Sequence, residues 1–306
     1  MKVGVNALPQ ATAWSDYREL CLRVEDLGYA SFWAYDHFVS RTPNGLGPTF
    51  ECLTALAALA PVTRTITLGS LVLASEFRHP SLVAKAAATL AQITDGRFAL
   101  GMSAGSNEAE HRMFGIPYPD ARERVDRFAH AVSIIRALLH GETVTRRPDD
   151  PFPLTEARLI PAAVPPPKIV IGARQPRMLR LVSLFADIHV SAASPEELRV
   201  LNSDLDVLCA RVGRAPDSIE RAVIVYEACG PTEAVVSAKR AALETLFGRP
   251  FAAIANRVLV GSTDQLVARL GEYREAGADH VFITALPPYD YDFLEYFMTE
   301  VASAVA

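Results

Sequence analysis

Short apolar runs alternate with longer amphipathic segments along the whole chain. The runs have the length and the β-branched and aromatic content of buried strands. They lie at Lys2–Asn6, Ser31–Tyr35, Ile66–Leu73, Arg97–Met102, Lys168–Gly172, Asp187–Val190, Ala222–Ala228 and His280–Ala285. Because these runs are nearly continuous in their apolar residues, the pattern predicts parallel strands that are covered on both faces.

Amphipathic segments of helical length fill the spaces between these runs. Pro80, Pro176 and Pro195 stand where a first helical turn needs no backbone donor, and Ser194 with Glu197 predicts a capping box. His79 is expected to cap the helix that Pro80 opens. The expected helices are Ser15–Leu27, Phe50–Ala60, Pro80–Gln92, Asp120–Leu139, Pro176–Phe185, Pro195–Val212, Thr232–Phe247 and Thr263–Ala276, with Phe293–Val305 after the last strand.

This alternation favours a closed (β/α)8 TIM barrel over an open doubly wound sheet. We expect residues 1–306 to form a single domain. The segment 140–167, rich in Pro, Asp and Arg, breaks the rhythm and is interpreted as an excursion before the fifth strand. In such a barrel, the site lies at the carboxyl ends of the strands.

Composition narrows the class of protein. Half of the 306 residues are hydrophobic, and the formal net charge is −5, without the basic stripe that nucleic-acid binding needs. The four cysteines have no metal-ligand or disulfide spacing, the chain opens directly into a strand, and no apolar run is long enough to span a bilayer. We therefore expect a cytoplasmic protein without nucleic-acid or membrane partners.

The first candidate for chemistry is Asp36-His37, an acid and an imidazole directly after the aromatic strand Ser31–Tyr35. A titratable pair at the carboxyl end of a barrel strand is placed for catalysis. The structural alternative is that Asp36 caps the following loop and His37 fills a polar gap.

After the fourth strand, the segment 101–108 reads Gly-Met-Ser-Ala-Gly-Ser-Asn-Glu. Gly-x-Ser-x-Gly is the nucleophile elbow of hydrolases, with Ser103 as nucleophile and His189 or His280 as its partner. The competing interpretation is a glycine-rich turn that lets backbone approach an anionic or planar ligand, lined by Asn107 and Glu108. The third interpretation of this segment is a turn without a functional role.

The fifth strand ends in Gly172-Ala173-Arg174 and leads into a helix, a combination that suits a phosphate group. The alternative is an ordinary turn. Gly69 inside the third strand indicates a bulge or a close backbone approach. There is no clustered set of metal ligands, so no metal site is expected. His111, His130 and His140 are expected in solvent.

Together these segments resemble the luciferase-like monooxygenase superfamily, and within it the F420-dependent oxidoreductases. The resemblance runs nearly from end to end. Its carriers are the segments at 31–37, 67–73, 78–80, 84–90, 95–98, 100–108, 171–176, 260–263 and 276–280.

The resemblance implies a (β/α)8 barrel that binds F420, or alternatively FMN, in its mouth. It implies that His37 is the proton donor or acceptor and that a non-prolyl cis peptide joins Leu71 and Val72. It also implies that Gly172, Ala173 and Arg174 receive the phosphate. The full set of cofactor contacts that it implies is Asp36, Ser70, Leu71, Val72, Ser103, Ala104, Gly105, Asn107, Gly172, Ala173 and Arg174.

The sequence departs from the family pattern in one place. Sugar-phosphate dehydrogenases of the family carry an acidic glutamate just after the glycine matched by Gly105, and Ser106 stands there instead. Glu108 is the nearest substitute. A sugar phosphate as substrate and a scheme with two acid–base residues are therefore in question.

We interpret the chain as an F420-dependent oxidoreductase that moves a hydride between the deazaflavin and a small alcohol, imine or activated alkene. The alternatives are an FMN-dependent monooxygenase, a barrel that binds a cofactor without turnover, and the Ser103 hydrolase. The resemblance suggests a homodimer. The substrate pocket is expected to be lined by Asn6, by residues 42–48 and 140–167, and by the loops after the seventh and eighth strands.

Overall fold

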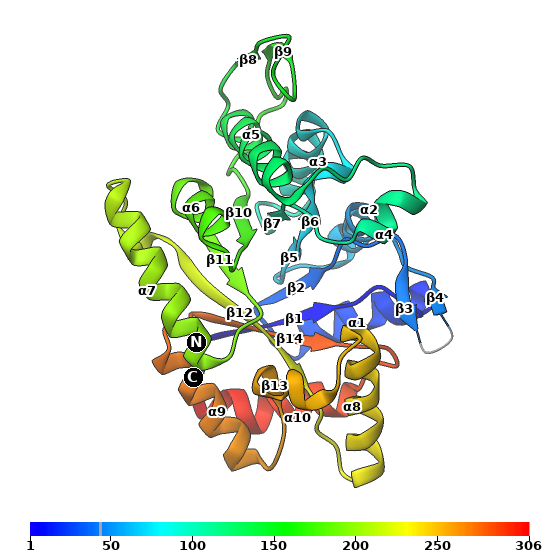
Figure 1. Cartoon of the computed structure of the whole chain (residues 1–306). Coiled ribbons are helices and arrows are strands. Elements are labelled where there is room, and N and C mark those ends of the chain that lie inside the picture. The colour runs from blue at the N-terminus through cyan, green and yellow to red at the C-terminus, as the bar shows by residue number, and fades with distance from the viewer. Residues whose placement is uncertain (43–44, 306) are drawn as a thin grey trace.

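A computed structural model describes residues 1–42 and 45–305. Its centre is a closed barrel of parallel strands surrounded by helices (Figure 1). The barrel strands are β1 (Lys2–Ala7), β2 (Ser31–Ala34), β5 (Thr67–Ser70) with β6 (Leu73–Ala74), β7 (Phe98–Ser103), β10 (Lys168–Gly172), β11 (Ile188–Ser191), β12 (Glu220–Glu227) and β14 (His280–Ala285).

Each strand pairs in parallel with its neighbours, and β7 pairs with β10 to close the ring. The (β/α)8 prediction is therefore confirmed. One expectation was wrong: the third strand is not continuous over Ile66–Leu73. It stops after Ser70 and resumes at Leu73; Leu71 and Val72, joined by a cis peptide bond, lie between the two parts, and the Leu71 amide still donates to the Ala34 carbonyl of β2 (2.7 Å).

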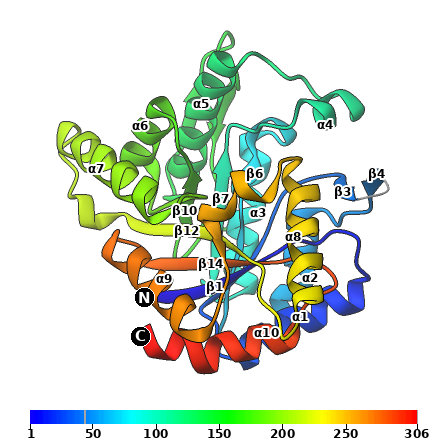
Figure 2. The same cartoon turned by 60° about the horizontal axis from the view of Figure 1, so that its bottom comes forward.

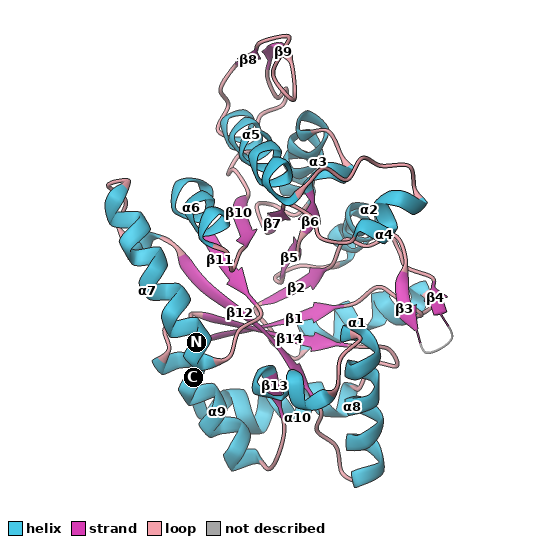
Figure 3. Ribbon diagram, viewed as in Figure 1, coloured by secondary structure: helices cyan, strands magenta, loops and turns pink. Residues whose placement is uncertain are grey.

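The helices cover the outside of the barrel (Figure 3). Their starts follow the local chemistry, since the His79 side chain accepts from the Ser81 amide and Ser194 forms its capping box with Glu197. None of the described helices combines the length and the apolar character that crossing a membrane requires. The surrounding helices are α1 (Trp14–Asp26), α2 (Cys52–Leu59), α3 (Pro80–Ile93), α5 (Ala121–Leu139), α6 (Pro176–Phe185), α7 (Pro195–Arg211), α9 (Thr263–Glu275) and α10 (Tyr291–Tyr296).

The segment expected as one helix over Phe293–Val305 is composite. After α10 it continues as a π-helical stretch, Phe297–Ala302, and a 3-10 turn, Ser303–Val305.

Several elements extend the carboxyl end of the barrel, called the mouth below. They are the hairpin of β3 (Ser40–Thr42) and β4 (Gly45–Gly47), the short helix α4 (Glu108–Met113), and the segment that carries α8 (Glu233–Phe247) and β13 (Val258–Leu259). Helix α8 contacts β3 beside the mouth (Figure 2).

The segment 140–167 forms a hairpin of β8 (Val144–Arg146) and β9 (Leu154–Ala157), which lies beyond α5 in Figure 1. Its later part is held on α3, where Lys85 Nζ donates to the Ile160 carbonyl (2.6 Å) and Gln92 to the Ala162 carbonyl (3.2 Å). The segment therefore packs outside the barrel.

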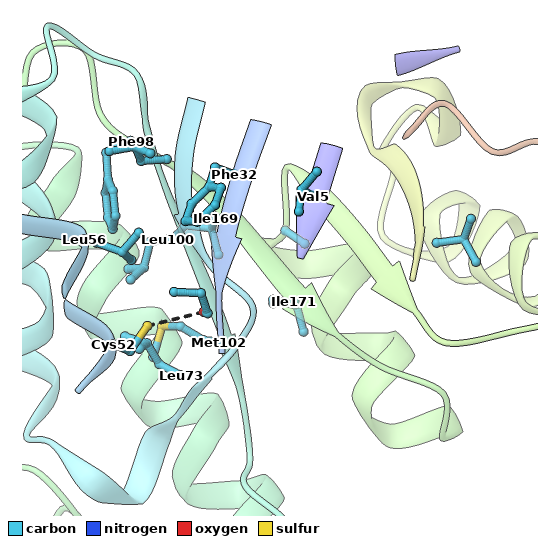
Figure 4. Packing of buried hydrophobic residues seen from close by; sticks show 14 of the residues in the cluster. Val5, Phe32, Cys52, Leu56, Leu73, Phe98, Leu100, Met102, Ile169 and Ile171 are labelled. Atoms are coloured by element: carbon cyan, nitrogen blue, oxygen red, sulfur yellow. Dashed lines mark hydrogen bonds between the residues drawn. The ribbon is translucent and has the colours of Figure 1, made fainter. Parts of the chain in front are cut away.

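Apolar side chains form two layers, because successive residues of a strand point to opposite faces. The outer layer lies between strands and helices; Figure 4 shows Cys52 and Leu56 of α2 beside Leu73, Leu100 and Met102. The inner layer fills the barrel. Its members are Trp33, Leu71, Ala99, Val170, Ile188, Val190, Ala222 and Phe282.

Gly69 makes room for the largest of these residues. A Cβ at position 69 would lie 2.2 Å from Cζ3 of Trp33 and 3.0 Å from the Ala99 carbonyl oxygen. The glycine that the sequence marked as a close approach is thus needed because an indole ring crosses its backbone.

A buried polar chain closes the amino-terminal end of the barrel, called the floor below. The Trp33 indole donates to Ser31 Oγ (2.7 Å), which lies 3.1 Å from His280 Nε2. His280 Nδ1 lies 3.0 Å from a Glu220 carboxylate oxygen. Burial lowers the pKa of His280 despite this carboxylate.

Candidate active site

Asp36, at the end of β2, is held by a salt bridge. Its two carboxylate oxygens accept from Arg78, at 2.7 and 2.8 Å, and one also accepts from the Ala74 amide at 3.1 Å. Arg78 in turn bonds Glu51, the N-cap of α2. Asp36 thereby ties β2 to the segment after the cis peptide and to the start of α3.

His37 projects into the mouth and is supported from behind by Glu110. Nδ1 of His37 lies 2.8 Å from Glu110 Oε2, while Glu110 Oε1 accepts from the Phe38 and Val39 amides at 2.9 and 3.1 Å. The His37 side chain is 36% exposed, and that of Glu110 is 1% exposed. Burial opposes ionisation of Glu110, but the bonds from His37 and the two amides hold its pKa below the ordinary value.

The short helix α4 buries two of its polar residues. Glu110 and His111 are buried, whereas Met113 and Phe114 are about half exposed. The expectation that His111 lies in solvent was therefore wrong. Its Nδ1 bonds the Pro117 carbonyl at 2.8 Å, and its ring packs between Phe77 and Tyr118. Among the residues that the structure describes, no group bonds its buried Nε2.

Leu71 and Val72 form the wall that joins two cavities at the mouth. The bond between them is cis, as the resemblance implied. The first cavity, about 190 Å³, contains His37 and Glu110; the second, about 240 Å³, contains Gly172, Ala173 and Arg174. Leu71, Val72 and Ser103 line both cavities. The His37 imidazole and the turn at residues 172–174 therefore lie at two ends of one surface.

The second cavity has polar groups available on one side. Within residues 1–42 and 45–305, Ser191 Oγ is buried without a hydrogen-bond partner, and no side chain caps the first turn of α6. Arg174 donates to Glu197 (2.9 Å) and to the Ala192 carbonyl. Glu197 also accepts from Arg257 (2.9 Å); against the effect of burial, bonds from Arg257, the Ser194 amide and Arg174 lower its pKa to about 2.

Gly172 keeps the second cavity open. A Cβ there would project towards Val72, 3.4 Å away, and towards Ser103, 3.9 Å away. Gly105, in the turn beside the first cavity, has φ +77°, a conformation that favours glycine.

Most of the predicted site residues reach these cavities, and two do not. Ser70 is fully buried in the barrel wall, where its hydroxyl bonds the backbone of Gly101 on β7 (2.9 and 3.0 Å). The Ala104 side chain packs in the outer layer. The members that line the first cavity are Asp36, His37, Leu71, Val72, Ser103, Gly105 and Asn107, and those that line the second are Leu71, Val72, Ser103, Gly172, Ala173 and Arg174.

Sequence reasoning missed Glu110, which supplies the acid beside His37. The substitute it considered, Glu108, has a 62% exposed side chain paired with Arg112. Ser106 lines the first cavity but carries no acid. Glu110 has no distinctive sequence signal, because nothing distinguishes it from Glu108 until the buried face of α4 is known.

The hydrolase arrangement is not assembled. Ser103 Oγ donates to the Gly172 carbonyl (3.4 Å), and His189 Nε2 bonds the Ala173 carbonyl (2.9 Å). His280 lies at the floor of the barrel with Glu220. Neither histidine is positioned to activate Ser103.

The expected lining of the substrate pocket is only partly as predicted. Asn6 is buried at the end of β1 and bonds Thr284 Oγ1 (3.3 Å). A largely apolar cavity of about 450 Å³ lies between α8 and the ends of β12 and β14, where the loops after the seventh and eighth strands meet. The segment 140–167 packs outside the barrel and does not line any cavity described at the mouth, while residues 43–44 of the 42–48 loop lie outside the described residues.

Groups of three or more His, Cys, Asp and Glu side chains placed to hold a metal ion are absent from the described part of the chain. The implied deazaflavin fits the residues that are present. The donor groups and the glycine cradle of the second cavity suit a phosphate, and the apolar wall at Leu71 and Val72 suits a planar ring.

Comparison with known proteins shows which family and fold the chain shares. The profile of the luciferase-like monooxygenase family matches residues 1–253. A 5,10-methylenetetrahydromethanopterin reductase from Archaeoglobus fulgidus is 28% identical over 92% of each chain. An F420-dependent glucose-6-phosphate dehydrogenase from Beutenbergia cavernae is 34% identical over about half of each chain, 53% and 52%. An F420-dependent secondary alcohol dehydrogenase, solved with an F420–acetone adduct, superimposes with a TM-score of 0.89 at 22% identity, over 100% of this chain and 99% of that one.

Proposed function

Because the chain belongs to the luciferase-like monooxygenase family, we propose that it is an F420-dependent oxidoreductase acting on a small organic substrate. The proposed substrate is an alcohol, an imine or an activated alkene. The F420-dependent relatives support the choice of cofactor.

The observation that carries the proposal is the shared wall of the two cavities. Leu71, Val72 and Ser103 connect a cavity with an imidazole to a cavity with a glycine turn and a helix start. An elongated ligand with a planar ring at one end and a phosphate at the other matches that arrangement.

Bound F420 supplies hydride donor and acceptor chemistry at its deazaflavin ring. The residues of this chain do the rest. Gly172, Ala173 and the start of α6 receive the phosphate, while Leu71 and Val72 support the ring. His37 takes or gives the substrate proton, because an imidazole can act as acid and as base and this one lines the first cavity.

Asp36 has a structural role in this scheme. Both of its oxygens are already bonded to Arg78, and one is also bonded to the Ala74 amide. It therefore fixes where His37 and the cis-peptide wall stand, instead of offering a free carboxylate.

A titration tests the cofactor. F420 added to the purified protein should saturate one site, followed by the change in its fluorescence, and FMN should bind at least tenfold more weakly. Gly172→Val should weaken F420 binding about tenfold or more, since the added methyl groups would occupy the second cavity. Gly271→Ala, whose Cβ would meet nothing within 4 Å, is the control and should bind like the wild type.

Three outcomes would contradict the proposal. Tighter binding of FMN than of F420 would favour the monooxygenase alternative. Saturable F420 binding without reduction or oxidation of any alcohol, imine or activated alkene would indicate a barrel that binds without turnover. Binding of neither cofactor would remove both enzyme assignments.

We also propose that the protein is a cytoplasmic homodimer. Its four cysteines are free and buried, which suits a reducing compartment. Leu82 on α3 is 61% exposed, and Ile160 and Val164, in the segment that runs along this helix, are 71% and 80% exposed; we propose that these side chains contact a second copy.

A further inference from the structure

We propose that Glu110 is the positioning residue for His37: it holds the imidazole with its proton on Nδ1 and so leaves Nε2 as the basic nitrogen available at the mouth. This inference rests on the proposed function, in which His37 exchanges a proton with the substrate.

The hydrogen bonds of Glu110 fix the tautomer of His37. An ionised carboxylate can only accept, and Glu110 Oε1 already accepts from the Phe38 and Val39 amides. Oε2, 2.8 Å from His37 Nδ1, therefore requires a proton on that nitrogen. Within the described residues, Nε2 of His37 has no protein partner, and the ring lines the first cavity.

Glu110 is also the charge that faces the imidazole. In the segment after β2, Asp36 is neutralised by Arg78, and the Tyr35 ring packs at a tilt against the imidazole, with its own hydroxyl bonded to Gln10 (2.5 Å). On α4, His111 bonds the Pro117 carbonyl and Glu108 pairs with Arg112. When His37 takes a proton, the Glu110 carboxylate thus stabilises the imidazolium at 2.8 Å.

The position of Glu110 differs from that of the family's second acid, the glutamate directly after the glycine matched by Gly105. The side chain comes from the buried face of α4 instead of the turn after Gly105, and its two oxygens are occupied by His37 and by backbone. Glu110 does not reach the substrate in this geometry; it acts through His37.

Glu110→Gln is the sharpest variant, because an amide of the same shape can still accept from the Phe38 and Val39 amides. Its NH2 group then points at His37 Nδ1 and donates to it, which forces the proton onto Nε2. We expect kcat with F420 to fall about 10²-fold or more, approaching His37→Ala, while the F420 Kd stays within about threefold. The acid limb of the kcat/KM profile should move to lower pH, since the imidazolium loses its carboxylate partner.

Glu108→Gln is the matched control: it removes an exposed carboxylate from the same helix and should leave rate and pH profile unchanged within about twofold. A second readout needs neither cofactor nor folding of a variant. In wild-type protein with 15N-labelled histidine at about pH 8, where a free imidazole is neutral, the ring nitrogen shifts should identify His37 as the Nδ1–H tautomer.

The outcomes separate the two ideas. An Nε2–H tautomer in the wild type, or a Glu110→Gln enzyme with the wild-type rate and pH profile, would overturn the role of Glu110. A wild type that shows the Nδ1–H tautomer but never turns over F420 would support the positioning role while contradicting the proposed function.

Discussion

Trp33 illustrates how one residue sets what its neighbours can be. Its indole lies across the barrel, donates to Ser31 and packs 4.8 Å from the ring of Phe282. The backbone of β5 passes so close to this ring that position 69 has no space for a side chain. Packing in an interior of this density leaves little room for relaxation.

Gly69→Ala should therefore destabilise the protein by about 1–3 kcal/mol, because the methyl group must displace the indole or the strand. Gly271→Ala in α9, where a Cβ meets nothing, should be neutral or stabilise by about 0.5–1 kcal/mol. Urea unfolding of the two variants measures the difference. Equal stabilities would mean that Trp33 does not hold the position described.

At the scale of elements, α8 is attached both by an apolar contact, in which Leu243 packs with Ile254 and Val258, and by ion pairs. Of its residues, Leu243 alone is buried. Lys239 connects the helix to the body of the protein through Glu227 on β12 (2.8 Å) and Asp290 before α10 (2.7 Å). Removing the ammonium group would leave two facing carboxylates with no cation between them.

Lys239→Met should loosen α8 by about 1–3 kcal/mol, so that its amide hydrogens exchange at least about fivefold faster. Arg240→Met removes the neighbouring cation from an exposed pair with Glu233 and should cost under about 0.5 kcal/mol. Hydrogen exchange read over residues 233–247 compares them. Equal exchange in both variants would show that apolar contacts, not the Lys239 pairs, hold the helix.

Elements that bury apolar residues and expose polar ones were predictable from the sequence. The apolar strands and capped helices predicted the barrel, and strand ends placed His37 and Gly172 at its mouth, whereas Leu71 and Val72 were predicted through the family resemblance alone. Helix α4, which buries Glu110 and His111 and exposes Met113, was not predictable, because apolar periodicity points to the wrong face. The contacts of the Ser70 side chain were not predictable for a related reason: its bond to Gly101 depends on the register of two strands, which the sequence does not reveal.

At the scale of the whole molecule, the outer surface carries the proposed dimer contact. The segment 140–167 lies along α3, held there by Lys85 and Gln92, and so adds its exposed Ile160 and Val164 to Leu82 of that helix. The excursion expected to line a pocket therefore shapes a surface instead.

The double variant Leu82→Glu with Val164→Glu should convert the dimer to a monomer, because buried unpaired carboxylates oppose association. Val200→Glu on α7, which is also 61% exposed, is the control and should remain dimeric. Light scattering after size-exclusion chromatography reports the mass. A monomeric wild type, or a double variant that remains a dimer, would contradict the proposed contact.

The filled barrel and its polar floor have a kinetic consequence. With Trp33 and Phe282 packed across the interior, and His280 bonded to Glu220 beneath them, a ligand reaches Leu71 and Val72 from the mouth side. A cofactor and a substrate that both enter from the mouth therefore bind in a fixed order. The one that binds deeper must bind first and be released last, so the order of binding follows from depth and not from affinity.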